Sequence, residues 1–236
     1  MSGQTPDATP ASARRGTQSI KGRLQALVRG VVGPPAALLG RIGMRPDHLT
    51  VVGLLWSVAA GLAFFEGAFR WGALLTALGG VCDILDGEMA RRLGGGSRFG
   101  AFLDSTLDRL AEAVVLVGLA GFYIGHLVEL TLDPRLAAEE IGRGLDPAVW
   151  ERVGLVAVLA LVGSFMVSYT RARAEGLGLA CRVGWFERPE RMVLIIAAAA
   201  FGVGPVMPAA LIGLTVLSFA TAAQRLAHVW KMTRIP

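Results

Sequence analysis

Six long apolar stretches recur along the 236-residue chain and limit what it can fold into. They cover residues 49–65, 71–81, 111–124, 153–167, 192–206 and 208–223. With their polar flanks extending into the headgroup region, each can form a span of roughly 17–25 residues. Hydrogen bonds within a helix satisfy its backbone polar groups in lipid. The pattern therefore predicts an all-α integral membrane protein with six transmembrane helices.

The basic residues lie mostly on one side of this predicted bundle. If the N-terminus is cytoplasmic, the segment up to Arg45 carries seven Lys and Arg, and the later cytoplasmic segments carry three, five and three, or 18 of the 23. This bias predicts a multi-pass protein of the plasma membrane with a cytoplasmic N-terminus. The net charge of +5 then reflects topology and contact with anionic lipids, and nucleic-acid binding is not needed to explain it.

The N-terminal part divides into two segments before the membrane domain at 46–236. Residues 1–18 are rich in Ser, Thr, Pro, Ala and Gly and are predicted to be a disordered tail. Residues 19–45 form a juxtamembrane segment with an apolar stripe and basic residues off that stripe. This pattern predicts an interfacial amphipathic helix, with a cytosolic helix as the alternative. The stripe consists of Ile20, Leu24, Leu27, Val28, Val31 and Val32.

Residues 83–108 contain a group of carboxylates at helical spacing. They read Asp83-x-x-Asp86-Gly87-x-x-Ala90-Arg91, then eight residues, then Gly100-x-x-x-Asp104-x-x-x-Asp108. Acids are costly in an apolar chain, so such a cluster indicates a function. Residues three or four apart share one face of a helix. A turn over 91–98 would fold the second and third predicted helices antiparallel, so all four carboxylates converge at the cytoplasmic face.

Converging carboxylates favour a divalent metal site, because four anions without a cation repel one another. All-oxygen ligands suit Mg²⁺ or Mn²⁺, and Mg²⁺ is commonly shared between carboxylates and substrate phosphates. Four carboxylates are enough for two ions. The predicted metal ligands are Asp83, Asp86, Asp104 and Asp108.

The whole 83–108 string resembles the signature of the CDP-alcohol phosphatidyltransferases. The resemblance implies transfer of a phosphatidyl group from CDP-diacylglycerol to an alcohol hydroxyl, with release of CMP. It further implies that Asp108 is the catalytic base, which the residues alone do not single out. The family is commonly homodimeric, which implies a homodimer here. The residues implied to bind the CDP-lipid are Pro46, Asp47, His48, Leu49, Thr50, Gly87, Arg91, Ser97 and Gly100.

Several of these residues also have a simpler interpretation. Asp47 is placed to be the N-cap of the first membrane helix. Gly100 fits close packing of two membrane helices equally well, and Arg91 fits a positive charge at the membrane surface.

Five arginines within 21 residues, from Arg171 to Arg191, indicate either topology anchors or a site for an anionic acceptor. The strings 168–176 and 188–191 and the pair Gln224-Arg225 resemble the phosphatidylinositol-phosphate synthase branch of the family, although Arg171 stands where that branch has lysine. This resemblance implies inositol 1-phosphate as the acceptor, with its phosphate held by Arg171, Arg191 and Arg225. Glycerol 3-phosphate or another small phosphorylated alcohol remains the alternative.

Two other interpretations fit the sequence less well. A small ion-coupled transporter would place its acids near the middle of the membrane and use internal repeats, whereas here the acids lie at one face and no repeat is visible. A structural protein without catalysis would not need four costly aspartates. The long outer segment at 126–152 is interpreted as a spacer with a short helix around 134–142.

Overall fold

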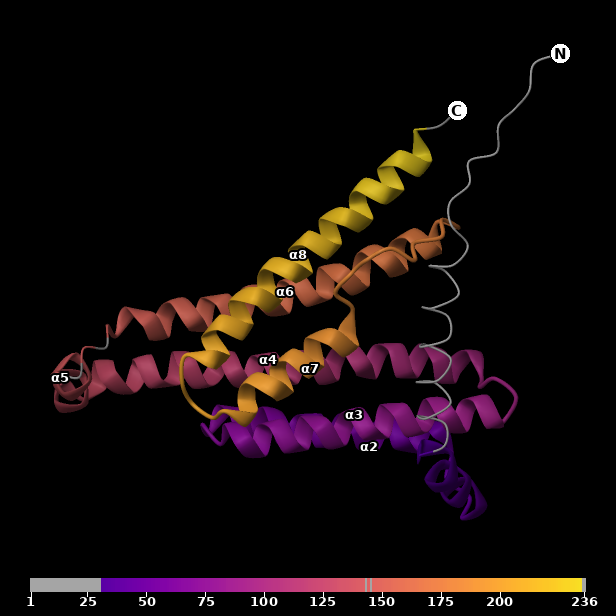
Figure 1. Ribbon diagram of the computed structural model, residues 1–236, viewed down its shortest axis with the longest axis horizontal. Coiled ribbons are helices and arrows are strands. Elements are labelled where there is room, and N and C mark those ends of the chain that lie inside the picture. The colour runs from indigo at the N-terminus through magenta and orange to yellow at the C-terminus, as the bar shows by residue number, and fades with distance from the viewer. Residues whose placement is uncertain (1–30, 143, 145, 235–236) are drawn as a thin grey trace, which may run out of the picture.

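The computed structural model describes residues 31–142, 144 and 146–234, and among these it contains helices and no strands. Residues 31–41 are helical, and seven labelled helices follow (Figure 1). The helices are α2 (Pro46–Phe65), α3 (Phe69–Arg92), α4 (Arg98–Leu132), α5 (Pro134–Gly142), α6 (Ala148–Gly176), α7 (Arg188–Ala200) and α8 (Val206–Thr233). The predicted tail at 1–18 and most of the amphipathic stripe in 19–45 lie outside the described residues.

The helices pack as a bundle with two distinct ends. α2 packs on α3 and α4, α4 on α6, and α6 on α8, while α7 contacts α3 and α8. Figure 1 shows the turn between α3 and α4, the segment between α6 and α7, and the C-terminus at one end of the bundle, and α5 at the other. The turn at 93–97 thus folds α3 and α4 back on one another, as the motif spacing predicted.

Each of the six apolar stretches forms all or part of a helix. Four of these helices, α2, α4, α6 and α8, are long and apolar enough to cross a membrane. α3 has 24 residues but includes two of the four acids of the motif, Asp83 and Asp86, and three arginines. α7 has only 13 residues, because the chain turns at Gly202, with φ at +80°, and Pro205 then caps α8. The helix expected over 192–206 therefore ends at Ala200.

Two predictions about local structure have clear outcomes. The short helix expected around 134–142 is confirmed as α5. The N-cap assigned to Asp47 is wrong: α2 begins at Pro46 and its N-cap is Arg45. Proline is favoured at the first helical position because its fixed φ suits the helix and no hydrogen bond is lost. Asp47 lies in the first turn instead, where its charge complements the helix dipole.

A glycine contact brings α2 and α4 close together inside the bundle. A Cβ built on Gly118 would lie 2.1 Å from the carbonyl oxygen of Gly61, so only glycine fits. Around this crossing, the core contains Phe64, Leu116 and Leu119, each fully buried. Small residues allow membrane helices to approach in this way.

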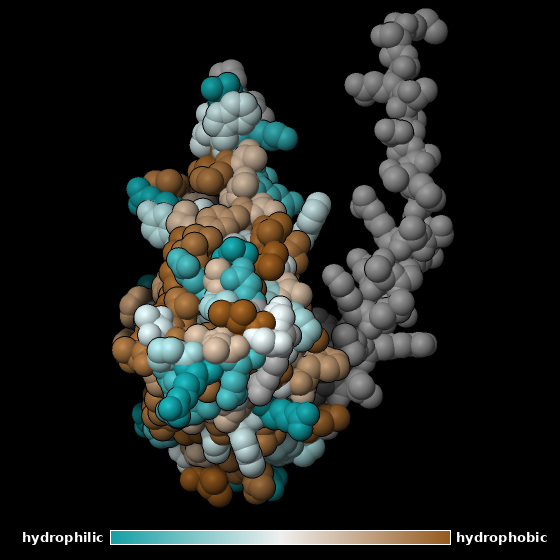
Figure 2. Space-filling model, turned by 90° about the vertical axis from the view of Figure 1, so that its left-hand side faces the viewer, coloured by the Kyte–Doolittle hydropathy of each residue, from teal (hydrophilic) through white to brown (hydrophobic). Residues whose placement is uncertain are grey.

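The outer surface of the bundle is largely apolar, as the membrane-spanning helices require. Large apolar side chains are exposed on each of them, for example Leu62 on α2, Val117 on α4, Leu155 on α6 and Val216 on α8. Apolar exposure on this scale marks a surface that meets lipid or another protein. Viewed from the end that carries α5, hydrophilic side chains are interleaved with the hydrophobic ones (Figure 2).

Candidate active site

Three aspartates from two helices lie close together where α3 and α4 meet the motif turn. Asp83 on α3 and Asp104 and Asp108 on α4 each offer a carboxylate oxygen, and these oxygens lie within 4.8 Å of one another. The Oδ1 atom of Asp104 is buried without a hydrogen-bond partner among the described residues. An orphaned carboxylate oxygen beside two other carboxylates fits a divalent cation, whose preferred ligands are oxygens.

Asp86 lies outside that group of three and has its own partner. Its side chain is 5% exposed, and its Oδ2 accepts a hydrogen bond of 2.8 Å from the Thr50 hydroxyl of α2. Asp86 still borders the same cavities as Asp83 and Asp104. Thr50, near the start of α2, therefore fixes the orientation of Asp86, the motif carboxylate outside the group of three.

Three cavities meet at these aspartates. An apolar cavity of ≈ 320 Å³ runs between α2, α3, α4 and α7 and reaches Asp83, Asp86 and Asp108. A glycine-lined cavity of ≈ 640 Å³ at the motif turn reaches Asp86 and Asp104. A third cavity of ≈ 380 Å³, here called the arginine cavity, opens beside Asp108. Two substrates and an ion can therefore meet at the carboxylates from different directions.

Most of the residues predicted to bind the CDP-lipid line the glycine-lined cavity. They are Pro46, Asp47, Thr50, Gly87, Ser97 and Gly100. His48 and Leu49 are not among its lining residues, and Leu49 packs in a small core cluster with Ala36 and Met89. Arg91 forms an ion pair with Glu88, at 3.1 Å between Nη2 and Oε2. The structure therefore gathers six of the nine predicted residues around one cavity.

The cavity is narrow where α4 begins. Ser97 is the N-cap of α4, and its hydroxyl accepts a hydrogen bond of 2.8 Å from the Gly100 amide. A Cβ on Gly100 would lie 3.0 Å from Asp47 Oδ1 and 3.1 Å from Ser97 Oγ. Gly100 therefore keeps space open at the cavity wall between α2 and α4.

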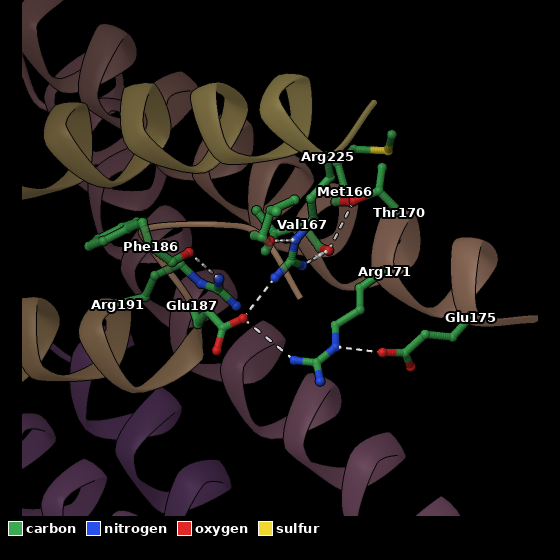
Figure 3. A network of polar contacts seen from close by, with 10 residues as sticks. Met166, Val167, Thr170, Arg171, Glu175, Phe186, Glu187, Arg191 and Arg225 are labelled. Carbon is green, nitrogen blue, oxygen red and sulfur yellow. Dashed lines mark hydrogen bonds and ion pairs between the residues drawn. The ribbon is translucent and has the colours of Figure 1, made fainter. Parts of the chain in front are cut away.

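The arginine cavity contains all three arginines predicted to hold the acceptor phosphate (Figure 3). Arg171 projects from α6, Arg191 from α7 and Arg225 from α8, and all three take part in hydrogen bonds or ion pairs within the protein. Arg191 is 1% exposed, and its Nε and Nη2 donate to the two carboxylate oxygens of Glu112 at 2.6 and 2.8 Å. Arg225 is similarly buried, whereas Arg171 is half exposed.

Residues 44–224 match the family described as CDP-alcohol phosphatidyltransferase. The chain belongs to the CDP-alcohol phosphatidyltransferase family. This match covers the four aspartates and both α2 and α7, which supply the side chains around them. The family resemblance of the 83–108 string is therefore confirmed, and the chain is an enzyme of the transferase class.

Curated relatives of this phosphatidyltransferase share about a third of its residues. Archaetidylinositol phosphate synthase of Methanothermobacter thermautotrophicus is 36% identical over 91% of this chain and 96% of that protein. Phosphatidylinositol phosphate synthase of Streptomyces avermitilis is 37% identical over 87% of this chain and 80% of that protein.

Solved structures agree with these sequence matches. Phosphatidylinositol phosphate synthase of Mycobacterium tuberculosis, in a crystal structure with CDP-DAG bound, superposes with a TM-score of 0.70. The two sequences are 33% identical, and the match covers 85% of this chain and 94% of that one. A crystal structure of the same enzyme with manganese and citrate gives a TM-score of 0.68 at 33% identity, over 84% of this chain and 88% of that one.

The phosphatidyltransferase site also contains residues that sequence reasoning did not assign. Arg188, the first residue of α7, lines both the apolar and the arginine cavity and pairs with two of the aspartates. Glu112 holds Arg191, and Glu187 contacts two arginines. Glu112 could have been noticed, because it continues the four-residue spacing of Gly100, Asp104 and Asp108. No such spacing in the sequence links Glu187 to Arg171 and Arg225.

Proposed function

We propose that this enzyme transfers a phosphatidyl group from CDP-diacylglycerol to inositol 1-phosphate, forming phosphatidylinositol phosphate and releasing CMP. The observation that carries the proposal is the position of Asp108, which belongs to the carboxylate group and also lines the arginine cavity. An acceptor whose phosphate is held by arginines there has its hydroxyl beside the carboxylates. The names of the relatives, archaetidylinositol phosphate synthase and phosphatidylinositol phosphate synthase, support the same acceptor.

The two other cavities are assigned to the CDP-lipid. The glycine-lined cavity, with Asp47, Gly87, Ser97 and Gly100, takes the nucleotide. Arg91 is not among its lining residues, but its Nη1 lies 3.5 Å from the position of a Cβ on Gly87, so its positive charge lies beside the cavity wall. His48 and Leu49 contribute by holding the start of α2: His48 Nδ1 accepts a hydrogen bond of 3.4 Å from the Arg45 amide, and Leu49 packs in the core cluster with Ala36 and Met89. The apolar cavity takes the part of the lipid next to the diphosphate, because its lining is mostly aliphatic and ends at the aspartates.

Asp83, Asp86, Asp104 and Asp108 are proposed to hold Mg²⁺ or Mn²⁺, with two ions matching four carboxylates and a diphosphate. When bound, the ions neutralise the diphosphate and the negative charge that develops during transfer. The clustered oxygens and the orphaned oxygen of Asp104 support this assignment. A relative crystallised with manganese supports the choice of metal.

Side chains of the protein bind the acceptor and take up its proton. Arg171, Arg191 and Arg225 hold the acceptor phosphate, and a guanidinium offers paired donors for this purpose. The acceptor hydroxyl attacks the lipid-side phosphorus, the bond from that phosphorus to CMP breaks, and the hydroxyl proton passes to Asp108. Fixing the two substrates in line supplies much of the rate.

Purified protein incubated with CDP-diacylglycerol, Mn²⁺ or Mg²⁺ and inositol 1-phosphate tests the proposal. The expected result is metal-dependent CMP release together with a phosphatidylinositol phosphate product. Glycerol 3-phosphate in a parallel reaction is the control acceptor. CMP release with glycerol 3-phosphate alone would overturn the acceptor assignment and leave the chemistry intact.

The membrane arrangement is also part of the proposal. α3 and α7 complete a six-helix domain over 46–236, and exposed Trp71 on α3 and Val193 on α7 support their contact with lipid. Residues 19–45 lie at the plasma-membrane surface, with the N-terminus and the active site in the cytoplasm. Labelling of single cysteines introduced at Gly95 and Arg135 in intact cells tests this, because only the second is expected to react with an impermeant reagent.

A homodimer is proposed from the family resemblance. Apolar side chains exposed on several helices leave enough surface for a second copy. Cross-linking of the protein in its native membranes tests for it, and a purely monomeric product would contradict it.

A further inference from the structure

One carboxylate occupies the centre of the arginine cavity. Oε1 of Glu187 lies 2.8 Å from Arg225 Nη2 and 3.5 Å from Arg171 Nη1 (Figure 3). Both arginines are proposed to hold the acceptor phosphate. A single oxygen of Glu187 therefore contacts two guanidinium groups in the manner expected of a phosphate oxygen.

Arg225 is held in place without this carboxylate. Its Nε donates to the carbonyl oxygen of Val183 at 2.8 Å, and its Nη1 donates to the carbonyl oxygen of Val167. The side chain of Arg225 is 2% exposed, whereas that of Glu187 is 42% exposed. Backbone contacts thus fix the guanidinium, and Glu187 is the partner that can leave.

Arg171 has a different second partner. Its Nε donates to Glu175 Oε1 at 3.0 Å, one helical turn further along α6. In the part of the chain that the structure describes, Glu175 makes no hydrogen bond or ion pair with Arg225 or Arg191, although it lines the same cavity. Glu175 is therefore a matched control: an exposed glutamate of the cavity that holds one acceptor arginine and does not sit between two.

We propose that Glu187 is a specificity-determining residue whose carboxylate occupies the position of the acceptor phosphate on Arg171 and Arg225. This inference rests on the proposed function. When the acceptor binds, its phosphate replaces Oε1, and the displaced carboxylate accepts hydrogen bonds from the other hydroxyls of the acceptor. An anion without hydroxyls must displace Glu187 and offers it no new partner, so it binds weakly.

The physical reason is the cost of leaving a charged group without a partner. A carboxylate that loses two guanidinium contacts inside a cavity needs new donors. The inositol ring carries more hydroxyls than glycerol 3-phosphate and compensates Glu187 better. A site built to pair with substrate hydroxyls discriminates against analogues that lack them.

A purely supporting role for Glu187 predicts the opposite result. If the carboxylate only held the two arginines in place, its removal would weaken the binding of every anion. If it competes with the acceptor phosphate, its removal strengthens the binding of a simple anion and weakens the preference for inositol 1-phosphate. The sign of the change in phosphate binding therefore separates the two roles.

The test compares wild type, Glu187→Gln and Glu175→Gln in two measurements. The first is the affinity for inorganic phosphate, measured from thermal stabilisation of the full-length protein without donor lipid. The second is the ratio of kcat/KM values for inositol 1-phosphate and glycerol 3-phosphate. Glu187→Gln is expected to bind phosphate about tenfold more tightly than wild type. Its kcat/KM ratio of inositol 1-phosphate to glycerol 3-phosphate is expected to fall about tenfold, the effect of one charge-assisted hydrogen bond. Glu175→Gln is expected to leave the ratio within about twofold of wild type, because surface ion pairs contribute little.

Glu187→Asp gives a second variant that keeps the charge and shortens its reach. It is also expected to bind phosphate more tightly than wild type, because the shorter side chain cannot contact both arginines. Weaker or unchanged phosphate binding in both variants would overturn the inference, as would an unchanged acceptor ratio in an active Glu187→Gln enzyme.

A failure of the proposed function would give a different result from a failure of the Glu187 inference. In that case wild type would release no CMP with inositol 1-phosphate. The phosphate-affinity measurement needs no turnover and would still decide whether Glu187 competes with a bound anion.

Discussion

Arg188 Nη1 lies 2.7 Å from Asp108 Oδ1 and 3.1 Å from Asp83 Oδ2. One guanidinium thus joins the carboxylate proposed as the base to a carboxylate proposed as a metal ligand. Arg188 also lines the cavity assigned to the lipid and the cavity assigned to the acceptor. It therefore lies where the phosphate being transferred has to pass.

Replacing Arg188 with glutamine is expected to lower kcat by about 10²-fold, the effect of removing one preorganised donor beside a developing negative charge. Arg188→Lys should recover only part of the loss, because lysine keeps the charge without the paired donors. CMP release measures both. Arg173→Gln, an exposed arginine of α6, is the control and should keep nearly full activity. A wild-type kcat for Arg188→Gln would refute this role.

Asp108→Asn is expected to bind CDP-diacylglycerol and to lose turnover. The amide keeps the shape of the side chain but does not accept the hydroxyl proton, which predicts a loss of roughly 10²–10⁴-fold in kcat. Donor binding is measured by isothermal titration and turnover by CMP release. Near-normal turnover would contradict the assignment of Asp108 as the base.

Asp104→Asn is expected to stabilise the protein in a chelator and to remove its response to Mn²⁺. Asp104 places a buried oxygen that has no partner among the described residues beside two other carboxylates. Loss of its charge therefore relieves repulsion and is expected to contribute about 1 kcal/mol. Unfolding temperatures with EDTA and with Mn²⁺ measure both effects. If the variant keeps the full Mn²⁺ response, Asp104 is not a ligand.

Glu112→Gln should destabilise the protein strongly, because Arg191 would remain charged and buried without its carboxylate. Breaking one side of a buried ion pair costs about 3–5 kcal/mol. The double variant Glu112→Gln/Arg191→Met removes the unpaired charge and should recover part of the lost stability. Thermal unfolding in detergent tests this pair of variants. Equal stability of Glu112→Gln and wild type would show that the pair is dispensable.

Gly118→Ala should destabilise the bundle, because the new methyl group would lie 2.1 Å from the Gly61 carbonyl oxygen. Overpacking of this kind costs about 1–3 kcal/mol. Gly125→Ala on the same helix is the matched control, since a Cβ there meets no atom of the described residues within 4 Å. The control should be as stable as wild type or slightly more stable. Equal unfolding temperatures for the two variants would show that α2 and α4 separate without cost.

The sequence predicted the helices and the carboxylate motif because both depend on local spacing. The apolar stretches located α2, α3, α4, α6, α7 and α8, and the three- and four-residue intervals of the motif brought Asp83, Asp104 and Asp108 together. Helix ends were predicted less accurately. The start at Pro46 and the end at Ala200 depend on single turn-forming residues inside or beside apolar sequence.

Partners that are far apart in the sequence could not be predicted in this way. Glu112 and Arg191 are 79 positions apart, and Arg188 and Asp83 are 105 apart. Their contacts depend on α7 packing beside α3 and on the direction in which each side chain leaves its helix. Neither property is encoded in a short motif. The acceptor arginines were recognised through resemblance, and the carboxylates that bind them inside the cavity became visible only in three dimensions.

The unequal lengths of α4 and α7 have a consequence for the surrounding lipid. At 1.5 Å per residue, the 35 residues of α4 extend about 52 Å, whereas the 13 residues of α7 extend about 20 Å. The hydrocarbon core of a bilayer is about 30 Å thick. In the proposed six-helix arrangement α7 is shorter than the hydrocarbon core, so the bilayer would have to thin beside it or draw headgroups toward the turn at Gly202. The side where α7 borders the apolar cavity is therefore where we expect the protein to deform its membrane.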